Sequence, residues 1–252
     1  MSVGGWAGRL RSSNPALSSA AFPGVGAWFG TGRMTIQGTV NKTAILLVLA
    51  VITAAFVWSR YEAGGSVVLW VLLGLIGGLV AALVTIFKKE WAPYSAPAYA
   101  LLEGLALGGI SAIFESSYPG IVIPAVSLTF GVLACLLIAY RSGLIPVTST
   151  FRMIVVSATG AIFVVYLLGA VMSLFGSGIP LIHESGPIGI LFSLFVVVVA
   201  SLNLVLDFDF IERASRMGAP SYMEWYAAFG LMVTLVWLYF EMLRLLSKLR
   251  RN

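Results

Sequence analysis

The stretch SVVLWVLLGLIGGLVAALVTIF, residues 66–87, decides the fold, because no charged side chain interrupts it. A helix needs about 20 mostly apolar residues to cross a bilayer. Comparable apolar runs occur at residues 43–59, 96–114, 121–140, 153–175, 188–206 and 225–246. Backbone groups cannot stay unpaired in lipid, and the short alternating strands of a barrel are absent from the sequence. The runs therefore predict an all-α, polytopic membrane protein with seven spans.

The composition agrees with this prediction. Of the 252 residues, 60% are hydrophobic and 10% are charged, whereas about a quarter of a soluble domain is charged. Residues 43–252 are predicted to form a single seven-span membrane domain. Residues 1–42 are rich in Gly, Ser, Ala and Pro and contain no apolar core of a signal peptide. They are predicted to form a flexible, polar, cytoplasmic tail.

Several chemistries are excluded by residue counts. Cys135 is the single cysteine and His183 the single histidine, so the chain can build neither a disulfide framework nor a thiolate zinc site. His183 lies outside the spans, which removes a Ser-His pair within the membrane. We expect no cofactor and no enzymatic activity. The basic residues are scattered between apolar runs, which favours anionic lipids over nucleic acid as their partners.

The basic residues also predict the orientation. If all seven segments cross, the side with the amino terminus carries ten Lys and Arg residues and the other side five. Cytoplasmic loops are enriched in these residues, so we expect a cytoplasmic amino terminus. If the last segment instead dips in and returns, the ratio becomes fourteen to one. The count therefore leaves the crossing of residues 225–246 open.

Pairs of glycines occur at four-residue spacing, at positions 74 and 78 and at positions 104 and 108. This spacing lets helix backbones approach closely in a membrane. The segment with the glycines at 104 and 108 also carries Glu103. Glu103 is an ionisable residue at membrane depth and is therefore a candidate functional residue by default. No basic side chain lies three or four residues from Glu103. We therefore expect Glu103 to face the bundle interior.

A second acidic cluster closes the sixth span, in LNLVLDFDFIER, residues 202–213. Asp209 has Arg213 four residues later, so a salt bridge at the helix end explains it, and the same holds for Glu212 with Arg216. Asp207 has no such cation. Asn203 lies one turn before Asp207, and we expect its amide to hold the Asp207 carboxyl group.

Several motifs in order resemble the Bax-inhibitor/YccA family, and in particular its bacterial branch. They are MTIQGTVNKT at residues 34–43, YALLEG at 99–104, FR at 151–152, LNLVLDFDFIE at 202–212, YMEWY at 222–226 and LRLL at 243–246. The resemblance implies a seven-helix bundle in which the last helix is surrounded by the other six. It also implies a multi-pass protein of a bacterial inner membrane.

Members of that family are described as pH-sensitive calcium leak channels, as suppressors of cell death and, in bacteria, as partners of a membrane AAA protease. Their pH latch is a pair of aspartates in the sixth and seventh helices. Asp207 matches the first aspartate. The second falls at Met232 or Thr234, and neither is acidic.

Two functions follow as hypotheses. The first is a passive cation leak, with calcium as the transported ion, because calcium prefers six to eight oxygen ligands. Its pathway or pH sensor would involve Asp207, Glu103, Asn203, Asp209 and Thr234. The alternative is a membrane-embedded binding protein that modulates a membrane AAA protease or a stress response without transport. The sequence identifies neither the ion nor the oligomeric state.

Overall fold

The computed structural model describes residues 32–175 and 186–251. In that part of the chain seven helices are long and apolar enough to cross a membrane. They are α1 (Ile36–Glu62), α2 (Val68–Phe87), α3 (Ala92–Ser117), α4 (Val122–Arg141), α5 (Ser149–Leu174), α7 (Pro187–Arg216) and α8 (Tyr222–Arg251), with a short 3-10 turn, η2 (Lys89–Trp91), before α3. The predicted all-α membrane fold is confirmed.

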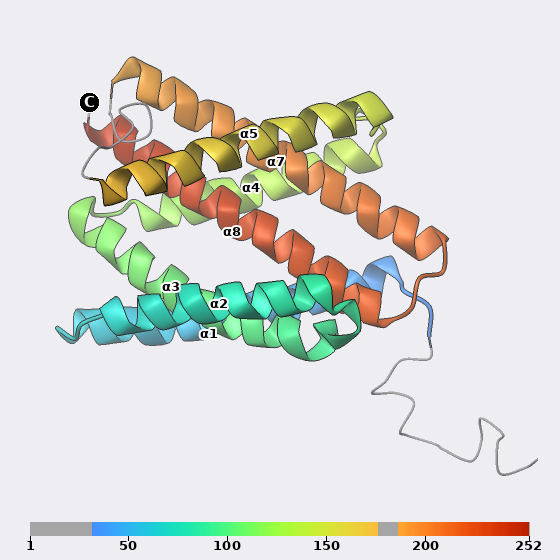
Figure 1. The fold of residues 1–252 in the computed structure, drawn as a ribbon, viewed down its shortest axis with the longest axis horizontal. Helices are drawn as coiled ribbons and strands as arrows, with labels where there is room; N and C mark the ends of the chain where they lie inside the picture. Colours follow the sequence, from blue (N-terminus) through green and yellow to red (C-terminus); the bar gives the residue numbers. More distant parts are fainter. Residues whose placement is uncertain (1–31, 176–185, 252) are drawn as a thin grey trace, which may run out of the picture.

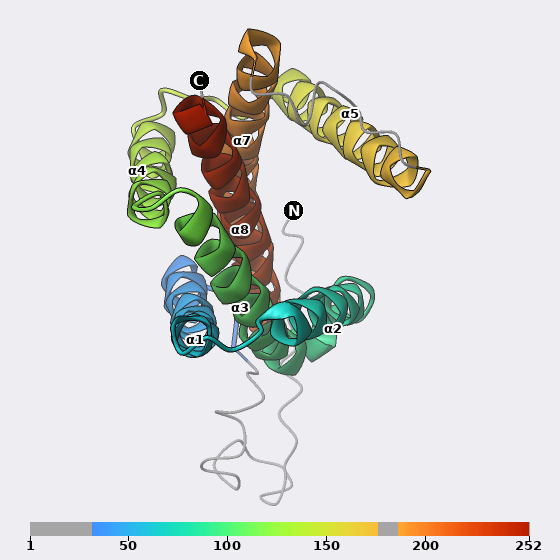
Figure 2. The ribbon, with the colours of Figure 1, turned by 90° about the vertical axis from the view of Figure 1, so that its left-hand side faces the viewer.

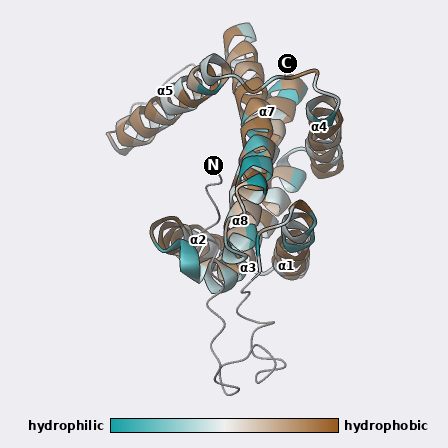
Figure 3. Cartoon of the chain, turned by 90° about the vertical axis from the view of Figure 1, so that its right-hand side faces the viewer, coloured by the Kyte–Doolittle hydropathy of each residue, from teal (hydrophilic) through white to brown (hydrophobic). Residues whose placement is uncertain are grey.

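Helix α8 runs through the middle of the bundle (Figures 1 and 2). Helices α1, α3, α4 and α7 pack directly against it, while α2 packs on α3 and α5 packs mainly on α7. The outward faces of the surrounding helices are apolar, as Figure 3 shows for α1, α2, α4 and α5. An apolar outer face and a central helix are what a bundle in lipid requires, and the predicted position of the last helix is confirmed.

The last helix is continuous, and its two ends lie at opposite ends of the bundle. Near its carboxyl end, Lys248 donates a hydrogen bond of 2.9 Å to the carbonyl of Gly189 in the first turn of α7, and Arg250 donates to the carbonyl of Pro119. A helix of 30 residues is about 45 Å long. The last segment therefore crosses the bundle and does not turn back.

Helix α1 begins before the apolar run that predicted it. The Thr35 side chain accepts a hydrogen bond of 2.9 Å from the backbone N–H of Gly38, which caps the helix so that it starts at Ile36. The predicted tail thus contributes its last seven residues, 36–42, to the helix. Residues 32–35 of that predicted tail lead into the helix, whereas residues 1–31 lie outside the described residues, and so does His183.

Both glycine pairs lie where helices meet. A Cβ atom added to Gly104 would overlap the Ala50 carbonyl of α1, and one added to Gly108 would overlap Ala54. On the other side of α3, a Cβ atom at Gly74 of α2 would lie 2.6 Å from the Ala106 nitrogen. The glycines thus allow α1 and α2 to pack closely on α3, as their spacing indicates.

Candidate functional site

Asp207 of α7 faces Thr234 of α8. The Thr234 hydroxyl lies next to the Asp207 carboxylate and donates a hydrogen bond of 3.3 Å to the Gly230 carbonyl of its own helix. The second carboxylate oxygen, Oδ2, is buried and has no hydrogen-bond partner among the described residues. Met232, the other position considered for the family's second aspartate, is fully buried in the apolar cluster that includes Leu46. Thr234 is therefore the residue opposite Asp207.

Glu103 of α3 lies in the interior, as predicted, with 9% of its surface exposed. It lines a cavity of about 340 Å³ between α2, α3 and α8, together with Gly78, Tyr99, Phe229 and other residues. Its Oε2 lies so close to Gly78 that an added Cβ atom there would be 3.1 Å away. Within the described helices, no ion pair reaches this carboxylate.

The buried Glu103 and the half-buried Asp207 flank one turn of α8. Gly230 and Val233 line the cavity that contains Glu103, and Thr234 lies next to Asp207. Residues 230–234 of α8 thus lie between an acid from α3 and an acid from α7. We call Glu103, Asp207 and this turn of α8 the central acidic site.

Asn203 does not hold Asp207 as the sequence predicted. Its amide nitrogen donates to Thr159 Oγ1 of α5 at 2.8 Å and to the Val199 carbonyl at 2.9 Å. An amide nitrogen carries two protons, and both are used by these bonds. The expected amide contact is wrong because helical spacing fixes a face of α7 but not which neighbouring helix covers each part of that face. Asn203 links α7 to α5.

Asp209 is held by two cations. Arg213 lies 2.8 Å from one carboxylate oxygen, as the spacing predicted, and Arg152 of α5 lies 2.7 Å from the other. The Asp209 side chain is buried, so this double ion pair ties the start of α5 to α7. Each carboxylate oxygen of Asp209 is therefore paired with an arginine.

Glu212 also has the predicted partner, since it forms an ion pair with Arg216. In addition it accepts a hydrogen bond from the Tyr140 hydroxyl at the end of α4. The end of α7 is thereby attached to α4 by Glu212 and to α5 by Asp209.

Glu224, at the start of α8, is bound by two residues at the start of α1. It forms an ion pair with Lys42 of α1 and accepts hydrogen bonds from the Thr35 backbone N–H at 2.8 Å and the Thr35 hydroxyl at 2.9 Å. A carboxylate at a helix amino terminus is stabilised by the helix dipole. The sequence could not reveal this contact, because 182 positions separate Glu224 from Lys42.

The carboxyl-terminal half of α8 contains a further cluster of hydrogen-bonded polar side chains, formed around Glu241. Glu241 is 2% exposed and pairs at 3.0 Å with Arg244, three residues later in the same helix. The Tyr166 hydroxyl of α5 donates to Glu241 at 3.0 Å and accepts from Arg244. The contribution of Tyr166 was missed, since nothing in its own helix points to it.

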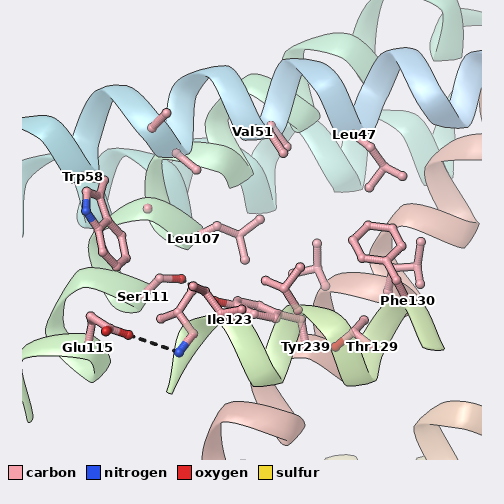
Figure 4. A pocket seen from close by; sticks show the side chains of 18 of the residues that line it. Leu47, Val51, Trp58, Leu107, Ser111, Glu115, Ile123, Thr129, Phe130 and Tyr239 are labelled. Carbon is pink, nitrogen blue, oxygen red and sulfur yellow. Dashed lines mark hydrogen bonds between the residues drawn. The ribbon is translucent and has the colours of Figure 1, made fainter. Parts of the chain in front are cut away.

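A cavity of about 690 Å³ is an apolar groove between α1 and α4, with α3 and α8 at its base (Figure 4). Ser111 and Tyr239 form a hydrogen bond of 2.7 Å at this base. At one end Glu115 accepts from the backbone N–H of Val122 at 3.1 Å and so caps α4. Ser111, Tyr239 and Glu115 of this groove are thus already hydrogen-bonded within the protein.

The five predicted site residues do not form one ligand set. Asp207 and Thr234 lie next to each other, Glu103 lies on the other side of the same turn, and Asn203 and Asp209 face α5. In the described part of the chain, no three acidic, histidine or cysteine side chains lie close enough together to hold a metal ion.

Comparison with known proteins gives a match over most of the chain. No curated protein and no solved structure matches it. A family model described as Bax inhibitor 1 like matches residues 11–251. The order of motifs, the seven helices and the central position of α8 agree with this match, and the chain belongs to the Bax inhibitor 1 like family.

Proposed function

We propose that this protein is a passive cation leak in which the central acidic site is the point that a permeating cation meets. Calcium is the proposed ion. The observation that carries the proposal is the buried Oδ2 of Asp207, which has no hydrogen-bond partner in the described residues. A buried polar atom without a partner is costly, and such groups in membrane proteins mark ion pathways.

Glu103 supports the same proposal. It is a buried carboxylate without a cation in the described structure, and it approaches the same turn of α8 through a cavity. Two negative groups on opposite sides of one turn attract a cation more strongly than either alone. Asn203 and Asp209 have a supporting role in the proposal, because their bonds to Thr159 and Arg152 fix the position of α7 relative to α5.

The pH sensor of this proposal is Asp207 alone. Two adjacent carboxylates titrate as a coupled pair, but the group opposite Asp207 is the Thr234 hydroxyl, which does not titrate in the physiological range. Protonation would remove one charge from the contact between α7 and α8. We therefore expect a shallower pH response than a pair of aspartates gives.

Calcium flux into proteoliposomes tests the proposal. The parent should carry calcium, and Asp207→Asn should lower the flux about tenfold and flatten its dependence on pH. Glu212→Gln, in which a carboxylate already paired with Arg216 is changed, is the matched control and should leave both unchanged. Absence of flux from the parent at every pH would contradict the leak and favour the alternative, a binding protein that modulates a membrane protease.

The proposed location is a bacterial inner membrane, as the family resemblance implies. The ratio of basic residues supports an amino terminus in the cytoplasm. Ser117 is exposed at the end of α3, just before α4, and Ser142 is exposed directly after the end of α4. In a Cys135→Ala background, Ser142→Cys should react with an impermeant thiol reagent only from the cytoplasmic side, and Ser117→Cys only from the outside. The reverse pattern would overturn the orientation.

A further inference from the structure

The cavity at Glu103 opens sideways between α2 and α8. Leu79 and Ile86 of α2 and Val233 of α8 line it, and each is also exposed on the outer surface of its helix. In a bilayer this outer surface contacts acyl chains. The cavity is therefore accessible from the hydrocarbon region.

Glu103 lies deep in that region. It is eleven residues from the start of α3 at Ala92, or about 16 Å at the rise of an α-helix. The hydrocarbon core is about 30 Å thick, which puts the carboxylate near its middle. A lipid headgroup does not reach this depth, so an ammonium group of a phospholipid is not its counter-charge.

The walls of the cavity suit an organic cation. Tyr99 and Phe229 contact each other edge to face, with ring centroids 4.9 Å apart and an angle of 82°, and both rings line the cavity. Aromatic rings attract cations, and the attraction is larger where water is excluded. Glu103 is the acidic residue of this lining, and the other lining side chains, apart from Tyr99, are apolar.

Two glycines provide the space. Gly78 leaves room for the Glu103 carboxylate on one wall, and beside Gly230 an added Cβ atom would meet nothing within 4 Å. The volume of about 340 Å³ lies in the range of small-molecule sites. One positive charge surrounded by apolar atoms would complement a carboxylate in such a space.

We infer that this cavity binds a lipophilic organic monocation, such as a protonated tertiary amine with an alkyl or aromatic substituent, which enters from the bilayer. Its ammonium group pairs with Glu103, and its apolar part lies against α2 and the two aromatic rings. A resident metal ion fits less well, because the lining offers only the Glu103 carboxylate and the Tyr99 hydroxyl, whereas calcium takes at least six oxygens. The inference does not depend on a leak activity.

Photolabelling in phosphatidylcholine nanodiscs tests this site. The probe is a dodecyl dimethylamine with a diazirine in its chain, and the matched neutral probe is the corresponding dodecanol. The amine should label peptides covering residues 75–86 and 229–233, and excess unlabelled amine should prevent this. Glu103→Gln should raise the half-labelling concentration at least tenfold. Glu62→Gln, which changes an acid lining the separate groove of Figure 4, should leave labelling unchanged.

A second variant tests the space itself. Gly230→Leu should fill the cavity and abolish labelling, and circular dichroism checks that the variant is folded. Equal labelling by amine and alcohol would overturn the inference, as would unchanged labelling of Glu103→Gln. Displacement of the amine by calcium but not by other organic amines would also overturn it, in favour of a metal site.

Discussion

Asp207 and Asp209 are two residues apart on α7 and have opposite surroundings. Asp209 is bound by Arg152 and Arg213, while Asp207 lies next to a hydroxyl and has one buried oxygen without a hydrogen-bond partner in the described residues. Two residues correspond to a rotation of about 200° around a helix, so Asp209 faces α5 and Asp207 faces α8. Neighbours in sequence thus belong to two different regions of the molecule.

The same contrast separates the end of the bundle near Tyr222 from its centre. At that end Glu224 forms an ion pair with Lys42. In this respect Glu224 is like Asp209, which pairs with two arginines. In the centre, Glu103 has no basic partner among the described residues. Buried ion pairs are strongly destabilising to break, whereas an unpaired buried carboxylate is itself a cost. The difference supports the proposal that the central acids are functional, whereas the paired acids stabilise the fold.

The largest expected effect is on Glu224. Glu224→Ala should lower the free energy of unfolding by about 3 kcal/mol, because it leaves Lys42 and Thr35 without their partner. Thermal denaturation in detergent micelles measures the loss. Glu62→Ala is the control, since Glu62 is exposed at the opposite end of α1 and bonds only to Trp58 among the described contacts. A loss as large in the control would contradict the contrast.

The next effect is expected at the centre. Asp207→Asn should lower calcium flux about tenfold, equivalent to about 1.4 kcal/mol, without lowering the melting temperature. The substitution keeps the size of the side chain and removes a buried charge, so stability should be unchanged or higher. A loss of stability comparable to that of Glu224→Ala would mean that Asp207 is structural.

A smaller effect is expected from Asn203, which joins α7 to α5. Asn203→Leu removes its hydrogen bond to Thr159, and interhelical hydrogen bonds in membranes contribute about 0.6 kcal/mol on average. A double-mutant cycle with Thr159→Val should give a coupling energy of this size. A coupling near zero would show that α5 is held by its other contacts alone.

The smallest effect is expected from Arg152→Gln. Asp209 keeps Arg213 when Arg152 is lost, and the Arg152 side chain is 47% exposed. Partly exposed ion pairs contribute about 0.5 kcal/mol, so the melting temperature should change little. Arg152→Gln combined with Arg213→Gln should cost clearly more than the two single changes together, because only the double variant leaves Asp209 unpaired.

The sequence was sufficient to predict features that depend on residues close together in the chain. Apolar length gave the spans, four-residue spacing gave the partners of Asp209 and Glu212, and the lack of a nearby cation indicated that Glu103 faces inward. Contacts between distant helices could not be obtained in this way. The pairing of Glu224 with Lys42 and the bond from Asn203 to α5 depend on how helices are arranged around α8, which periodicity within one helix does not specify.

Two variants, Asp207→Asn and Glu224→Gln, test most directly the claim that the central acids are functional and that Glu224 stabilises the fold. Calcium flux and melting temperature are measured on the same preparation of each variant. Both changes replace one carboxylate oxygen by an amide nitrogen, so the side chains are matched in kind. We predict that Asp207→Asn loses calcium flux and keeps its melting temperature, while folded Glu224→Gln has a lower melting temperature and keeps its flux. The opposite assignment, or loss of both properties in both variants, would contradict the separation of a functional centre from a stabilising end.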